Sequence, residues 1–156
     1  MPFIFDTNSL RVLGNYYPER FPSFWKRFEE MVEKKEVLSV REVYNEITKQ
    51  VKDEWYLEWL EAHREMFLAP SADEGTFVAQ IFRVAHFQQL VGEEQRLKGQ
   101  PVADPFVVAC AKVRNGIVVT EEAVKENAAK IPNVCKHFKI ECTDVEGFLK
   151  INDWKF

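Results

Sequence analysis

The amino-acid sequence predicts an α/β fold, a three-layer α/β/α sandwich around a central parallel sheet. Short apolar or aromatic runs alternate along the chain with longer segments of helical spacing. Such runs are typical of parallel strands that are covered on both faces. Strands that alternate with helices form right-handed βαβ units. Because neither an internal repeat nor a low-complexity linker interrupts the pattern, we expect one domain over residues 1–156.

The individual elements follow from local composition. Strands rich in β-branched or aromatic residues are expected at 2–5, 37–40, 116–119 and 139–142. Helices with apolar spacing or helical charge patterns are expected at 21–35, 42–52, 55–65, 73–90, 105–114, 121–130 and 145–150. The helix over 73–90 has a wide apolar face that packs on the sheet or against another subunit. A homodimer is expected as well.

The composition is that of a globular protein, since 46% of the residues are apolar and 29% are charged. With a net charge of −4 the chain is not a polycation, so nucleic acid would have to bind through local basic patches or bound cations. Three cysteines without a C-x-x-C pair indicate neither a disulfide framework nor a zinc ribbon and favour the reducing cytoplasm. Neither a secretion signal nor an apolar run of ~18 residues is found, so no membrane span is expected.

A carboxylate directly follows the first predicted strand. Asp6 comes after the apolar residues 3–5 and is followed by Thr7 and Asn8. In open α/β sheets, the loops that leave the carboxyl ends of strands form the crevice in which ligands and metals bind. A site there requires that other carboxylates converge on Asp6.

Glu46 lies on the second predicted helix, whose apolar stripe contains Val43, Ile47 and Val51. At ~100° per residue, Glu46 lies at the edge of this stripe and Glu42 lies nearly opposite it. Glu46 is therefore the better candidate for a crevice. The alternative is that both are solvated charges, which is the common role of Glu on an amphipathic helix.

Asp104 stands where the helix over 105–114 is expected to begin, with Pro105 at the first helical position. An Asp before Pro is a common helix cap, which alone would explain this residue. Asp104 is also in register with the buried positions Val107 and Val108, so its carboxylate is expected to point inward. A buried carboxylate needs a cation.

The strand over 116–119 ends in Thr120, Glu121 and Glu122, which repeats the arrangement at the end of the first strand. Acids in the first turn of a helix favour its dipole, so ordinary helix-start chemistry is the alternative for both glutamates. The joint pattern favours a site, because acids occur at the ends of two strands and at helix positions that face the same edge.

Taken in order, these motifs resemble those of the PIN-domain nucleases, a family that includes the VapC-type toxins. Residues 5–8 resemble its first acid motif, 43–47 its second, 104–109 its D-x-x-x-x-A element and 118–122 its strand-Thr-x-acid ending. The likeness spans nearly the whole chain. Two features differ from the family pattern: the last acid is Glu where many members have Asp, and helical material is added between residues 55 and 99.

The resemblance implies a PIN-like fold and an acidic pocket that holds Mg²⁺ or Mn²⁺. The catalytic and metal-site residues that it implies are Asp6, Glu46, Asp104 and Glu122. Asn8 and Thr120 are implied as supporting residues that steady the carboxylates, and Glu121 competes with Glu122 for the fourth position. The implied activity is that of a metal-dependent endoribonuclease that hydrolyses RNA phosphodiester bonds. Such a protein would be the toxin of a toxin–antitoxin pair, with an antitoxin protein as its partner.

Two other functions stay open. A catalytically inactive PIN-like module would bind RNA or protein without cutting, although four retained and mutually repelling acids argue against this reading. A phosphatase or receiver-like domain with an aspartyl nucleophile would have a second acid two residues after Asp6, where Asn8 stands.

Overall fold

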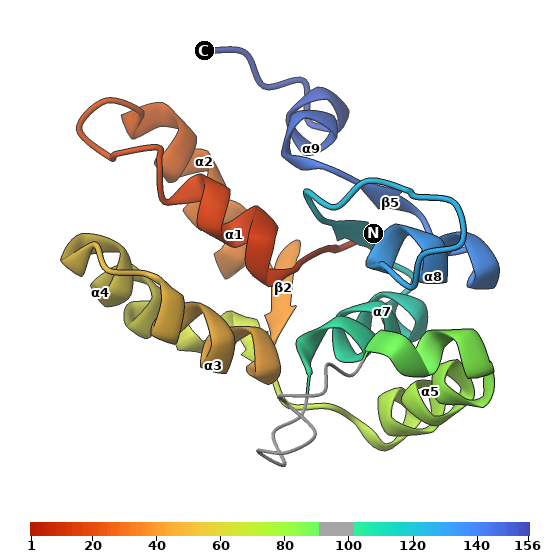
Figure 1. The fold of residues 1–156 in the computed structure, drawn as a ribbon. Helices are drawn as coiled ribbons and strands as arrows, with labels where there is room; N and C mark the ends of the chain where they lie inside the picture. The colour runs from red at the N-terminus through yellow and green to blue at the C-terminus, as the bar shows by residue number, and fades with distance from the viewer. Residues whose placement is uncertain (91–101) are drawn as a thin grey trace.

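The computed structural model describes residues 1–90 and 102–156, and within them the strands form one five-stranded parallel sheet (Figure 1). The strands are β1 (Phe3–Phe5), β2 (Val37–Val40), β3 (Phe67–Leu68), β4 (Ile117–Val119) and β5 (Cys142–Thr143). Their order across the sheet is β3-β2-β1-β4-β5, and every neighbouring pair is parallel. The predicted α/β fold with a central parallel sheet is confirmed.

Helices flank this sheet. They are α1 (Thr7–Leu13), α2 (Pro22–Glu33), α3 (Arg41–Gln50), α4 (Glu54–Ala62), α5 (Ala72–Arg83), α7 (Ala103–Arg114), α8 (Ile131–Phe138) and α9 (Val145–Ile151), with the 3₁₀ helices η1 (Arg64–Met66) and η2 (Ala85–Leu90). Helix α7 packs against β1, β2 and β4, and α5 lies beside α7 (Figure 1). In the described part of the chain, no helix has the length and apolar character needed to cross a lipid bilayer.

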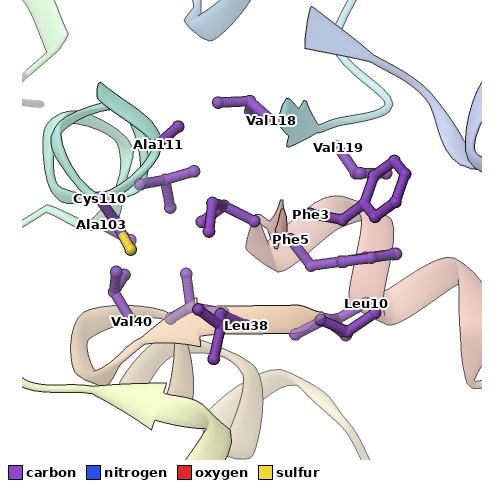
Figure 2. Packing of buried hydrophobic residues seen from close by; sticks show 14 of the residues in the cluster. Phe3, Phe5, Leu10, Leu38, Val40, Ala103, Cys110, Ala111, Val118 and Val119 are labelled. Atoms are coloured by element: carbon purple, nitrogen blue, oxygen red, sulfur yellow. The ribbon is translucent and has the colours of Figure 1, made fainter. Parts of the chain in front are cut away.

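The core is built around β1, whose three residues are all buried. Alternation along the strand directs Phe3 and Phe5 to one face, where both rings meet Phe148 of α9 edge-on at centroid distances of 4.8 and 5.2 Å. Phe5 also contacts Phe28 of α2 at 5.5 Å. Figure 2 shows small side chains of α7, such as Ala111, on the other side of the strands. Both faces of the central strand are thus covered, as a parallel sheet requires.

The winding of the sheet reverses at β1. The chain runs from β1 outward through β2 to β3, then returns to β4 on the other side of β1 and continues to β5. In doubly wound sheets, ligands bind outside the carboxyl ends of the strands at this reversal. Asp6 follows β1 and Thr120 follows β4. Two of the motifs singled out in the sequence therefore flank the expected crevice.

One predicted helix, over 121–130, is wrong. The segment is irregular, and the next helix begins at Ile131. Two acids near the start of the segment accept backbone hydrogen bonds from more distant elements: Glu122 from Ile131 and Glu121 from Val145. These tertiary contacts hold the segment in an irregular path despite its local helix propensity.

Several boundaries also differ from prediction. The helix expected over 73–90 ends at Arg83 and is followed by η2. The strand expected over 139–142 is displaced to β5, because Lys139 adopts a left-handed conformation (φ 58°) that ends α8. Helices α1 and α8 and strand β3 were not predicted. The extra helical material extends to Leu90, and the rest of it, residues 91–99, lies outside the described residues.

Trp55 and Trp59 of α4 belong to an aromatic cluster. Their rings lie 5.7 and 5.1 Å from the ring of Trp25 of α2, and both are partly buried. The Trp59 indole N–H donates to Glu29 at 2.9 Å. Two tryptophans four residues apart on a helix can pack against other side chains or stack on bases. These contacts favour the packing role.

Candidate metal centre

Asp6 is held in place by helix α1, which follows it, and by the end of the neighbouring strand β4. Its backbone N–H donates to the Val119 carbonyl at 3.1 Å, which continues the β1–β4 ladder. Its carboxylate caps α1: Oδ1 accepts the Ser9 N–H at 2.8 Å and lies 2.8 Å from the Ser9 hydroxyl. Oδ2 accepts the Thr120 hydroxyl. A side chain that is 2% exposed is therefore fixed in one orientation.

Burial raises the pKa of Asp6 to about 6. The hydrogen bonds from Thr120 and Ser9 act in the opposite direction, because they stabilise the ionised form, and the nearby charge of Glu122 raises the pKa further. The carboxylate is thus both oriented and electrostatically strained near neutral pH.

Glu46 joins three helices at the same edge of the sheet. From α3, its Oε2 accepts the hydroxyl of Thr7 on α1 at 2.7 Å. Its Oε1 accepts the backbone N–H of Ala103, the first residue of α7, at 3.3 Å. Both carboxylate oxygens are engaged, so the side chain points into the crevice between these helices instead of into solvent.

Asp104 is in the first turn of α7, but it is not the cap. The capping position is Val102 and the helix starts at Ala103, so Pro105 is the third helical residue. The cap interpretation is therefore wrong. Asp104 is partly exposed, and none of the hydrogen bonds within residues 1–90 and 102–156 involves its carboxylate.

Crowding with other acids is the main feature of Asp104. Burial, followed by the charges of Glu122, Asp6 and Glu46, raises its pKa to about 7. Each of these three carboxylates comes from a different element of the fold. The charges of these three acids therefore reach Asp104, near the carboxyl ends of β1 and β4.

The two glutamates after β4 have different surroundings. The charge of Glu122 raises the pKa of both Asp6 and Asp104. One of its carboxylate oxygens accepts the N–H of Ile131 at 3.0 Å. Glu121 instead turns to the start of α9, where Oε1 accepts the N–H of Val145 at 2.8 Å. This difference favours Glu122 over Glu121 as the fourth acid.

The residues that orient the acids are only partly those expected. Thr120 binds Asp6 as the resemblance implies, but Glu46 is held by Thr7, and Ser9 holds Asp6 from the helix side. Asn8 lines a neighbouring groove. A sequence signal existed, since a hydroxyl residue three positions after a capping Asp commonly shares the helix N-terminus with it.

A second pair of acids is buried away from this point. Glu42, expected to be solvated, is 2% exposed and Glu74 of α5 is fully buried. Burial raises the pKa of Glu42, with Arg41 opposing and Glu74 adding to the shift. The Nε of Arg114 lies 3.7 Å from Glu74 Oε1. Glu74 is on α5, which packs against α7. The periodicity of α3 alone does not reveal that a second acid from α5 influences Glu42.

The donor set fits a hard divalent cation in chemistry. Carboxylates and hydroxyls are the oxygen ligands that Mg²⁺ and Mn²⁺ prefer, and the pKa values of Asp6 and Asp104 are raised chiefly by burial and further by neighbouring acids. In the part of the chain that is described, no three His, Cys, Asp or Glu side chains are grouped tightly enough to enclose an ion.

Comparisons with known proteins agree with the fold. The model of a family described as "Domain of unknown function (DUF4411)" matches residues 3–156. Among solved structures, the chain is similar to "Crystal structure of VapBC2 from Rickettsia felis bound to a DNA fragment from their promoter", with a TM-score of 0.51 and 14% identity over 92% of this chain and 98% of that chain. No curated protein matches the sequence. At this identity, the likeness supports the shared fold.

Proposed function

We propose that this chain, which belongs to the DUF4411 family, is a divalent-metal-dependent endoribonuclease formed by a single domain over residues 1–156. The observation that supports the proposal is that the charges of Glu122, Asp6 and Glu46 all raise the pKa of Asp104, near the point where the winding of the sheet reverses. The motif order of PIN-domain nucleases and the fold likeness to the VapBC2 structure support the same assignment.

The chain's own residues pre-organise the acids for this role. Thr7 and the N–H of Ala103 fix Glu46, while Ser9 and Thr120 fix Asp6. Carboxylates that are already oriented need no rearrangement when charge develops during reaction. Because Asp104 makes no such bonds in the described part of the chain, it is free to adjust to a ligand.

Mg²⁺ or Mn²⁺ would be held by Asp6, Glu46, Asp104 and Glu122, directly or through water. When bound, such a cation lowers the pKa of a water molecule and neutralises charge on the phosphodiester. The carboxylates hold and orient the attacking water, whose oxygen forms a bond to phosphorus as the bond to the 3′-oxygen breaks. The products carry a 5′-phosphate and a 3′-hydroxyl.

Metal removal is expected to abolish activity. Purified protein should cleave a single-stranded or looped RNA with Mg²⁺ or Mn²⁺, and EDTA should stop cleavage because the carboxylates alone cannot neutralise the phosphodiester. Gel analysis of labelled RNA measures the effect. Cleavage that persists in EDTA would contradict the metal mechanism.

The two adjacent glutamates provide the matched control for this experiment. We expect Glu122→Gln to lower kcat by roughly 100-fold or more, and Glu121→Gln to lower it far less, because only the first of these charges acts on Asp6 and Asp104. Equal and small losses would mean that neither glutamate is the fourth acid.

We further propose that the protein is the toxin of a toxin–antitoxin pair and acts as a homodimer. Its acidic crevice would be blocked by an Arg or Lys side chain of the antitoxin, through a charge-assisted bond to the crowded carboxylates.

Expression in growing cells tests the toxin proposal. The chain alone should slow growth, co-expression of the protein encoded beside it should restore growth, and Asp6→Asn should make that neighbour unnecessary. Harmless wild-type protein at high expression would refute the toxin role, while the nuclease assay above is independent of it.

A further inference from the structure

A groove of about 560 Å³ lies beside the acids and has no part in holding them. One wall is formed by Asn8 and Arg11 on the polar face of α1 and by Asn15 in the turn that follows this helix. The other wall is the end of α3 and the turn after it, with Gln50 and Lys52. Asn8 is two residues from Asp6, so the groove leads away from the metal centre along α1.

The two walls are joined across the groove. The Arg11 guanidinium on α1 donates through Nη1 to Oε1 of Gln50 on α3 at 3.1 Å. This bond limits the rotamers of a long side chain, so less conformational freedom is lost when the guanidinium binds a ligand. Among residues 1–90 and 102–156, Arg11 uses one guanidinium nitrogen in a hydrogen bond, which leaves its other N–H groups as donors.

The groove is lined by both cations and acids, and they differ in whether they can meet a ligand. Arg11 and Lys52 supply cations, and Asp53 and Glu121 supply acids. The Glu121 carboxylate, however, accepts the N–H of Val145 and is directed to α9. Among the lining residues, the wall formed by α1 and the turn after it has one cation and two amides and no acid, so it presents donors to an anion.

From this arrangement we propose that the groove binds the nucleotides of single-stranded RNA that flank the scissile phosphate, with Arg11 on a backbone phosphate and the amides on ribose and base. This inference rests on the proposed ribonuclease function. An Asn or Gln amide both donates and accepts, which matches the 2′-hydroxyl that distinguishes RNA from DNA. The guanidinium suits a phosphate, which it can bind with two parallel hydrogen bonds.

Binding is tested separately from cleavage. Fluorescence anisotropy of a short labelled single-stranded RNA, in EDTA, measures affinity without turnover. Arg11→Ala should weaken binding roughly tenfold, as for one charge-assisted hydrogen bond. The slope of log K against log salt should fall by about 0.7, as expected for one lost phosphate contact on a single strand. Gln50→Ala should weaken binding in the same direction, because it releases Arg11.

Arg83→Ala is the matched control. Arg83 is an exposed arginine in the last turn of α5, and its loss should leave both affinity and salt slope unchanged. In steady-state cleavage, Arg11→Ala should raise KM and leave kcat nearly unchanged, because the residue binds away from the reacting phosphate.

The outcomes separate this inference from the function on which it rests. If wild-type protein cleaves RNA but Arg11→Ala changes neither Kd, salt slope nor KM, the groove assignment is wrong and the nuclease stands. If the RNA binds with the expected Arg11 dependence but is never cleaved with metal, the nuclease proposal fails and the groove stands. If a DNA strand of the same sequence binds as tightly as RNA, the 2′-hydroxyl role of the amides is wrong.

Discussion

Replacing Asp104 by asparagine is expected to abolish RNA cleavage and, at about pH 8, to make the metal-free protein more stable. Both effects follow from one feature, the crowding of Asp104 by three other acids. An amide cannot serve as an anionic metal ligand, so we expect at least a 100-fold loss of kcat. The same change removes an ionised group whose charge the folded state disfavours.

The pH dependence has a definite sign. The pKa of Asp104 is raised from 3.8 to about 7 on folding. Between these values the folded state retains a proton that the unfolded state has lost, so wild-type stability falls as pH rises through this window. The Asp104→Asn variant does not lose stability in this way as pH rises. Because Asp104 is partly exposed, we expect a gain of about 1–2 kcal/mol above pH 7, smaller than the shift alone would give at ~1.4 kcal/mol per unit, and little gain near pH 4.

Asp73→Asn provides the matched control, because Asp73 is an exposed acid in the first turn of α5. It should lower stability by at most about 1 kcal/mol, through the helix dipole, and leave cleavage intact. Thermal or urea unfolding in EDTA measures both variants. A stability loss in Asp104→Asn at high pH with cleavage retained would identify Asp104 as a structural residue.

Arg114→Met is expected to destabilise the fold by about 1–2 kcal/mol, which is less than for a fully buried ion pair because the Arg114 side chain is 38% exposed and screened by solvent. Glu74 is fully buried, and neither of its oxygens has a hydrogen-bond partner among the described residues. The Arg114 guanidinium, 3.7 Å away, is the cation paired with it. Removing that cation leaves a buried charge next to Glu42, which is also buried and acidic.

A double-mutant cycle distinguishes this pairing from simple loss of a long side chain. The Glu74→Leu, Arg114→Met double variant removes both charges and should recover most of the lost stability, since apolar replacement of a whole buried pair is often neutral. Lys112→Met, in the same last turn of α7, should change stability by less than about 1 kcal/mol. If the double variant is as unstable as Arg114→Met alone, charge pairing is not the cause.

The sequence predicted the features that depend on contiguous residues. Asp6 and Thr120 each follow a buried apolar run, and such a run followed by a polar residue marks the end of a strand wherever the strand packs in the sheet. Position 104 was identified from another local pattern, its register with an apolar helix face.

Features that depend on distant partners escaped prediction. Glu42 lies opposite the apolar stripe of α3, yet it is 2% exposed, and α3 packs against α7. The irregular path after Val119 is set by hydrogen bonds from the starts of α8 and α9. Thr7 acts on a glutamate 39 positions later in the chain. Local periodicity contains no information on such contacts.

The central place of β1 in the sheet also determines when Asp6 can be fixed in place during synthesis. The first acid motif is near the start of the chain, but Asp6 takes its backbone partner from Val119 and a side-chain partner from Thr120. A ribosome that has made Asp6, Glu46 and Asp104 has therefore not yet made the strand that sets Asp6 in place. Pairing over so long a separation is slow to form and unavailable to a growing chain. A chain that stops before residue 119 would carry three of the acids without the partners that hold Asp6 in place, so the site can form only after this segment has been made.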